Sequence, residues 1–209
     1  MHHDTLSARS FLDNISKGQV ENNLQWMLGQ ELQGSIVGIV GLGNIGQAIV
    51  KRLKGFDVGR FVYTDYCRMK AGICLGAHFV SLDELLEQSD LVIVATPLIN
   101  ETRGMFNDNA FSKMKKTVVF VNIGCGEVVN TEALVKALRS NSIFAAGLDI
   151  TDPESLSSDH QLLKLPNAVI LPYLGSGTVK TRDNMSIIAA ENTLNGLEGS
   201  IRIIIDKFV

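Results

Sequence analysis

The sequence predicts an α/β fold of the doubly wound type, in which one parallel sheet carries helices on both faces. Two observations support this class. Short apolar runs rich in valine and isoleucine alternate with segments of helical period, and a glycine-rich loop separates the first run from the first helical segment. With 209 residues, 45 % of them apolar and 20 % charged, the chain can bury the core of one such domain.

Six apolar runs are expected to be the strands. They are apolar on both faces, as strands buried between two helical layers are. The runs cover residues 35–40, 61–64, 91–95, 118–122, 144–149 and 168–171.

Helices are predicted between and around these runs. One covers 44–53, and a capping box formed by Ser81 and Glu84 opens another over 82–88. Asn130 is expected to cap the next helix, and a long helical pattern covers 178–197. The first 30 residues are interpreted as a helical lead-in, followed by the main domain over 31–199.

The glycine-rich loop runs from Gly38 to Gly46 with the sequence GIVGLGNIG. Gly41 would allow the tight turn after the first strand, Gly43 the close approach of a pyrophosphate, and Gly46 the packing of helix on sheet. The helix that starts at Asn44 and Ile45 would present N–H groups to the phosphates. The loop therefore predicts a Rossmann-type dinucleotide-binding domain, the alternative being a purely structural turn.

Asp65 ends the second apolar run, at the spacing of roughly 20 residues where an acidic side chain binds the adenosine ribose. A carboxylate there accepts hydrogen bonds from the ribose hydroxyls and repels a 2′-phosphate, so NAD is favoured over NADP. Two alternatives stay open. Asp65 can be a solvated residue at a strand end, and the nearby Arg68 and Lys70 could meet a phosphate.

Composition excludes several classes of protein. A net charge of −3 does not indicate binding to nucleic acid or to an anionic membrane surface. Three scattered cysteines, Cys67, Cys74 and Cys125, predict neither a disulfide framework nor a metal site. No secretory signal and no membrane-spanning run is recognised, so a cytoplasmic protein is expected.

Seven further segments occur together in a characteristic order. They are 94–98 (VATPL), 101–104 (ETRG), 111–115 (FSKMK), 121–126 (VNIGCG), 146–149 (AGLD), 152–154 (DPE) and 170–175 (ILPYLG). With the glycine loop, they make the chain resemble the D-2-hydroxyacid dehydrogenase family, most closely its glyoxylate/hydroxypyruvate reductase branch, from about Trp26 to Gly199. Residues 200–209 leave the family pattern and form a divergent tail.

The resemblance implies a coenzyme lobe and a substrate lobe, most of the second having no counterpart in this sequence. A homodimer and a small 2-oxo acid substrate are also implied. The branch's NADP users carry a Gly-Arg pair where Asp65-Tyr66 stands, which again favours NAD. The other cofactor contacts implied by the resemblance are Thr96, Pro97, Ile123, Asp149 and Gly175. For Asp149 the alternative is a helix or turn cap.

The family also has a catalytic trio of Arg, Glu and His. Their positions hold Cys125, Glu154 and Tyr173, so the Arg that orients the substrate and the His that donates the proton are both replaced. Cys125 can be a space-filling residue or, alternatively, a thiolate nucleophile. Tyr173 can fill a vacated pocket or act as a substitute acid.

Two functions follow as hypotheses. The first is an NAD-binding reductase of small 2-oxo acids whose catalysis is severely impaired. The second is a non-catalytic NAD-binding or partner-binding module. A third possibility is that the sequence is part of a longer product, which would not restore Cys125 or Tyr173.

Overall fold

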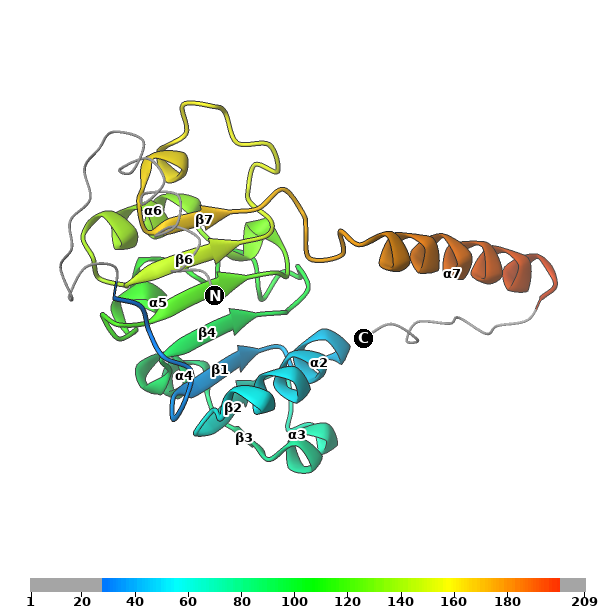
Figure 1. Cartoon of the computed structure of the whole chain (residues 1–209), viewed down its shortest axis with the longest axis horizontal. Helices are drawn as coiled ribbons and strands as arrows, with labels where there is room; N and C mark the ends of the chain where they lie inside the picture. The colour runs from blue at the N-terminus through cyan, green and yellow to red at the C-terminus, as the bar shows by residue number, and fades with distance from the viewer. Residues whose placement is uncertain (1–27, 200–209) are drawn as a thin grey trace. The chain divides into compact units, whose positions relative to one another are not determined.

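The computed structural model describes residues 28–199 (Figure 1). These form a first unit, which ends at Leu171, and a second unit, which starts at Pro172, and each is described by itself. Most of the expected helical lead-in and the whole divergent tail lie outside the described residues.

The first unit is built on a seven-stranded sheet whose strands all run parallel. The strands are β1 (Ile36–Val40), β2 (Arg60–Thr64), β3 (Ala77–Phe79), β4 (Leu91–Val94), β5 (Val119–Asn122), β6 (Ala145–Leu148) and β7 (Ala168–Ile170). Their order is β3-β2-β1-β4-β5-β6-β7, so the winding direction reverses between β1 and β4. This confirms the doubly wound class and places a topological switch point, where such folds bind ligands, at the carboxyl ends of β1 and β4.

Helices connect the strands, and all four predicted helices are confirmed. The α-helices are α2 (Asn44–Leu53), α3 (Lys70–Leu75), α4 (Leu82–Gln88), α5 (Asp108–Ser112), α6 (Thr131–Arg139) and, in the second unit, α7 (Val179–Leu197). Short 3₁₀ turns are η1 (Lys54–Phe56), η2 (Gly126–Val128) and η3 (Gln161–Lys164). Ser81 and Glu84 form the predicted capping box of α4, and Asn130 caps α6 through the Ala133 N–H.

Two apolar clusters cover the two faces of the sheet. One packs α4, α5 and α6 against it and contains edge-to-face aromatic contacts, with the rings of Phe106 and Phe120 5.0 Å apart. The other packs α2 and α3 and contains the buried Leu42 of the glycine loop. Helices therefore lie on both faces, as the layered fold requires (Figure 1).

Several details differ from the sequence prediction. The sequence does not predict the short elements β3, α3 and α5. Strand β4 ends at Val94, so Thr96 and Pro97 lie in the loop after it, where Pro97 has no N–H to continue a ladder. Strand β6 ends at Leu148, which makes Asp149 the first residue beyond it.

Asp90 ties the amino ends of neighbouring strands together. Its Oδ2 accepts the Ile36 N–H at 2.8 Å and its Oδ1 accepts the Lys115 ammonium at 2.7 Å. Desolvation alone would raise the pKa of Asp90, but the Lys115 and Ile36 hydrogen bonds and the Lys115 charge together lower it. The carboxylate therefore stabilises the fold in its ionised form.

Within residues 28–199, no helix is both long and apolar enough to cross a bilayer.

Candidate cofactor site

The glycine loop has room for a ligand at one position and closed backbone contacts at two others. A Cβ on Gly41, whose φ is +93°, would lie 2.9 Å from the Ala95 carbonyl oxygen, and a Cβ on Gly46 would lie 2.2 Å from the Gly41 carbonyl oxygen. A Cβ on Gly43 meets nothing within 4 Å. Gly41 and Gly46 are therefore required by packing, whereas Gly43 faces open space.

Hydrogen bonds hold the loop at Leu42. The Leu42 N–H donates to Asp65 Oδ2 at 2.7 Å, and the Leu42 carbonyl accepts the Gln47 side chain at 3.0 Å. Asp65 Oδ1 accepts the Tyr66 N–H at 2.8 Å. The residue predicted to bind the ribose thus also fixes the loop that would hold the phosphates, a contact that the sequence did not predict.

Tyr66 lies beside Asp65 and is exposed. The charge and hydrogen bond of Cys67, with smaller contributions from desolvation and from Asp65, raise the pKa of Tyr66. Its hydroxyl stays protonated at neutral pH and can donate a hydrogen bond.

Helix α2 begins immediately after the open position. Gly43 is its N-cap and offers no side-chain cap, and the first turn contains no acidic residue. Such an uncapped N-terminus attracts an anion through its N–H groups and dipole. The open space at Gly43 and this N-terminus fit the diphosphate of a dinucleotide.

The loops that follow β1, β4, β5 and β6 lie side by side at the carboxyl edge of the sheet, and each contacts its neighbour. Gly41 abuts the backbone of Ala95, a Cβ on Gly124 would lie 2.6 Å from the Thr96 carbonyl oxygen, and one on Gly126 would lie 2.3 Å from the Thr151 carbonyl oxygen. The predicted contacts Thr96, Pro97, Ile123 and Asp149 therefore belong to one row of loops.

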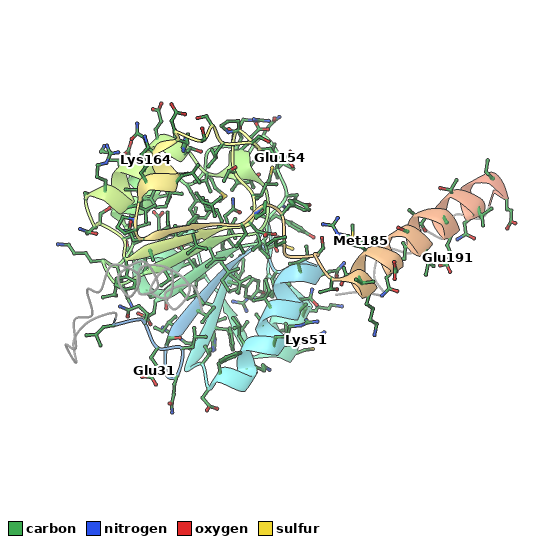
Figure 2. The ribbon with its side chains drawn as sticks, turned by 45° about the horizontal axis from the view of Figure 1, so that its top comes forward. Glu31, Lys51, Glu154, Lys164, Met185 and Glu191 are labelled. Atoms are coloured by element: carbon green, nitrogen blue, oxygen red, sulfur yellow. The ribbon has the colours of Figure 1, made fainter. Side chains whose placement is uncertain are left out.

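Two positions of the catalytic trio lie in the first unit. Cys125 is half-buried, packs against the cluster under α4, α5 and α6, and has extended backbone (φ −137°, ψ 143°) that an arginine also adopts. Glu154 is exposed in the loop after β6 (Figure 2). Tyr173, whose φ is +55°, and Gly175 belong to the second unit. The assigned roles of all these residues stay predictions.

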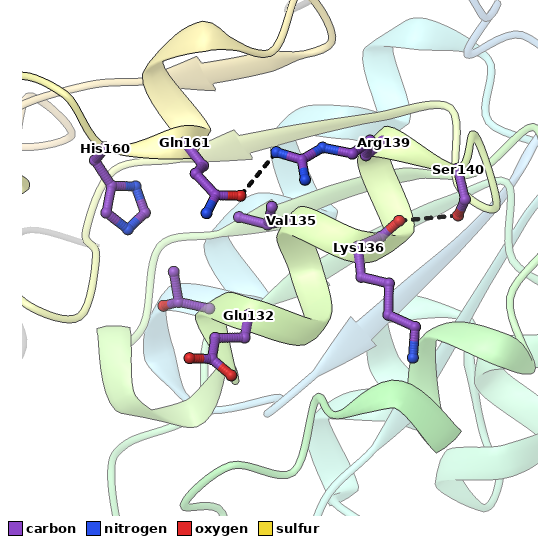
Figure 3. A pocket seen from close by; sticks show the side chains of 8 residues that line it. Glu132, Val135, Lys136, Arg139, Ser140, His160 and Gln161 are labelled. Atoms are coloured by element: carbon purple, nitrogen blue, oxygen red, sulfur yellow. Dashed lines mark hydrogen bonds between the residues drawn. The ribbon is translucent and has the colours of Figure 1, made fainter.

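All three cysteines are unpaired, and the described residues contain no group of three or more side chains suited to a metal ion. A hollow of about 530 Å³ lies between α6 and the segment at His160 and Gln161 (Figure 3). None of the predicted cofactor contacts lines it. Its cations are already partnered, Arg139 with Gln161 and Lys136 with Asp108.

Residues 5–175 match the family described as "D-isomer specific 2-hydroxyacid dehydrogenase, NAD binding domain". The chain belongs to this family. The predicted fold, family and NAD cofactor are confirmed at this level. The glycine loop, the switch point and the uncapped N-terminus of α2 are features with which doubly wound folds in general bind dinucleotides.

Among relatives, the human glyoxylate reductase/hydroxypyruvate reductase is 51 % identical over 175 residues, covering 83 % of this chain and 53 % of the human protein. The TT0316 protein of Thermus thermophilus superposes with a TM-score of 0.81 at 40 % identity, over 94 % of this chain and 64 % of that one. A D-isomer specific 2-hydroxyacid dehydrogenase of Lactobacillus delbrueckii, in an NAD-complexed form, gives 0.83 at 25 % identity over 96 % and 65 %. This dehydrogenase-family chain spans about half the length of the curated relatives it matches.

Proposed function

We propose that this chain is an NAD-binding protein of the 2-hydroxyacid dehydrogenase family in which hydride transfer to a small 2-oxo acid is severely impaired. The observation that carries this proposal is a contrast. The loop at Gly43 is open and held by Asp65 and Gln47, whereas the family's arginine position carries Cys125, packed on the apolar core.

Residues of this chain would hold the cofactor as follows. The N-terminus of α2 would bind the diphosphate, Asp65 the adenosine ribose, and the loop at Ile123 and Gly124 the nicotinamide riboside. NAD supplies or accepts the hydride when bound. Asp65 would repel a 2′-phosphate, which is why NAD is preferred to NADP.

The chemical half of the site is weakened at two positions. Cys125 offers no charge-assisted fork for a carboxylate, and each such hydrogen bond to a charged group is worth ~1.5–3 kcal/mol. Tyr173 places a phenol where the family has an imidazole, the side chain best suited to proton transfer near neutral pH, and loss of a matched acid costs ~10²–10⁴-fold in rate. Losses within one site do not simply multiply, but turnover should be far below that of an ordinary reductase.

Calorimetric titration of the full chain with NADH tests the binding. We expect saturable binding of one NADH per chain, whereas the absence of any binding would refute the proposal. Following NADH absorbance in the presence of glyoxylate or hydroxypyruvate tests the impairment, because turnover at ordinary reductase rates would show that Cys125 and Tyr173 suffice.

A second candidate function is retained reduction of glyoxylate or hydroxypyruvate. It is favoured by the 51 % identity to the human glyoxylate reductase/hydroxypyruvate reductase and by the retained Glu154. The double variant Cys125→Arg, Tyr173→His separates the two functions. A large gain in turnover, without a change in NADH affinity, would identify these two residues as the cause of impairment.

We also infer the setting in which the protein acts. Three unpaired cysteines support a reducing compartment such as the cytoplasm.

The family resemblance supports a homodimer, which light scattering on the purified chain would test. The same resemblance supports one NAD-binding domain over 31–199, with a lead-in before it and a divergent tail after it.

A further inference from the structure

Asn122 is a polar side chain buried at the end of an apolar strand. It is the last residue of β5, and its side chain is 1 % exposed. A buried amide destabilises a fold unless its polar atoms are hydrogen-bonded. Both polar atoms of Asn122 are used, and both bond to the loop that follows the strand.

The two hydrogen bonds hold opposite sides of that loop. Asn122 Oδ1 accepts the Gly124 N–H at 3.1 Å, and Asn122 Nδ2 donates to the Cys125 carbonyl oxygen at 2.9 Å. One side chain thereby fixes the directions of two peptide groups, Ile123–Gly124 and Cys125–Gly126, which flank the Gly124–Cys125 peptide. The main chain of Asn122 is fixed as well, because its carbonyl accepts the Asp149 N–H at 3.0 Å.

The loop has little freedom to move elsewhere. The backbone at Gly124 lies against the Thr96 carbonyl, and the backbone at Gly126 lies against the Thr151 carbonyl. Loss of the amide would leave the Gly124 N–H without this acceptor and the Cys125 carbonyl with only the longer bond from the Val128 N–H, at 3.4 Å. The path of residues 123–125 would then be held less tightly.

We infer that Asn122 is a positioning residue for the nicotinamide half of the cofactor. It sets the path of the loop whose Ile123 and Gly124 would meet the nicotinamide riboside. This inference rests on the proposed NAD binding. It assigns to Asn122 no contact with the adenosine half, which would be held by the α2 N-terminus and Asp65.

The test compares two probes on the full chain. ADP reports binding of the adenosine diphosphate half alone, and NADH reports both halves. The variant Asn122→Asp keeps the acceptor for Gly124 but places a carboxylate oxygen against the Cys125 carbonyl. We expect its Kd for NADH to rise at least about tenfold toward that for ADP, with the Kd for ADP within about twofold of the wild type.

Asn167→Asp is the matched control. The Asn167 side chain also makes two hydrogen bonds to main chain, its Nδ2 donating to the carbonyls of Leu138 and Phe144. It stands just before β7, at the opposite edge of the parallel sheet. We expect this variant to bind both probes like the wild type, whatever the change in its thermal stability.

Other results would overturn the inference. Unchanged NADH affinity in Asn122→Asp would do so, as would equal losses for NADH and ADP, which indicate a general structural role. If Asn122→Asp does not fold, Asn122→Ala removes both bonds without adding charge and must show the same selective loss, and failure of both to fold would make Asn122 a requirement of the fold instead. If the wild type binds neither probe, the proposed function itself fails. If it binds both equally, adenosine binding stands and the inference is wrong.

Discussion

Replacing Gly43 by aspartate separates cofactor binding from folding. The backbone there (φ −68°, ψ −165°) is accessible to any residue, and an added Cβ meets nothing within 4 Å. Gly43 is also the N-cap of α2, where aspartate can accept an N–H and favours the helix dipole. We therefore expect the free energy of unfolding of the unliganded variant to stay constant or rise by up to about 1 kcal/mol.

Although Gly43→Asp should not destabilise the fold, we expect it to weaken the binding of NADH. A carboxylate at position 43 would stand where the α2 N-terminus meets the diphosphate. Two like charges about 4 Å apart repel by about 4 kcal/mol at an effective dielectric constant of ~20. That energy corresponds to roughly a thousandfold increase in the Kd for NADH. Gly43→Asn adds the same volume without the charge, so the difference between the two variants isolates the electrostatic contribution.

Calorimetry and thermal unfolding measure both effects. NADH at about 100 times its Kd stabilises a protein by ~2.7 kcal/mol, which for a domain of this size raises Tm by roughly 5–10 °C. The wild type should show this shift and Gly43→Asp should not. Wild-type affinity in Gly43→Asp, or a marked fall in the Tm of the unliganded variant, would contradict the open position described at Gly43.

Three further changes have defined outcomes. Gly46→Ala drives a Cβ to 2.2 Å from the Gly41 carbonyl oxygen, which is backbone, so we expect a loss of about 1–3 kcal/mol in stability by denaturant unfolding. Asp65→Asn removes the charge that would repel a 2′-phosphate, and the ratio of NADPH to NADH affinities should rise about tenfold in competition titrations. The lowered pKa of Asp90 means that its stabilisation is present above the unfolded pKa of ~3.9 and is lost as pH falls through the folded value. Asp90→Asn should consequently flatten the fall in Tm below about pH 4, and an unchanged pH profile would remove Asp90 and Lys115 as its cause.

The elements that are predictable from sequence carry a periodic or capping signal. Helix α4 is located by Ser81 and Glu84, and α2 by the glycine loop before it. The elements that sequence reasoning misses are short: β3 has three residues, α5 has five and α3 has six. Neither period nor burial can be recognised over so few residues, and tertiary contacts stabilise such elements.

The part of the candidate site that could be predicted from sequence consists of the glycines of the loop and the charged residue Asp65. The roles of Gly41 and Gly46 follow from a spacing that packing requires, and their close contacts agree with it. The hydrogen bond from Leu42 to Asp65 and the two bonds of Asn122 could not be predicted. They depend on the orientation of the side chains and peptide groups, which only the folded backbone determines. A polar residue at the end of an apolar strand was the signal available for Asn122.

The contacts between neighbouring loops at Gly41, Gly124 and Gly126 join main chain to main chain. The row of loops, here called the rim, takes its shape from glycines that have no side chain at the contacts. It does not depend on the residues that would take part in a reaction. Evolution can therefore exchange a reactive residue such as the one at position 125 while the rim persists. One methyl group on any of these three glycines, by contrast, would disturb two adjoining loops at once.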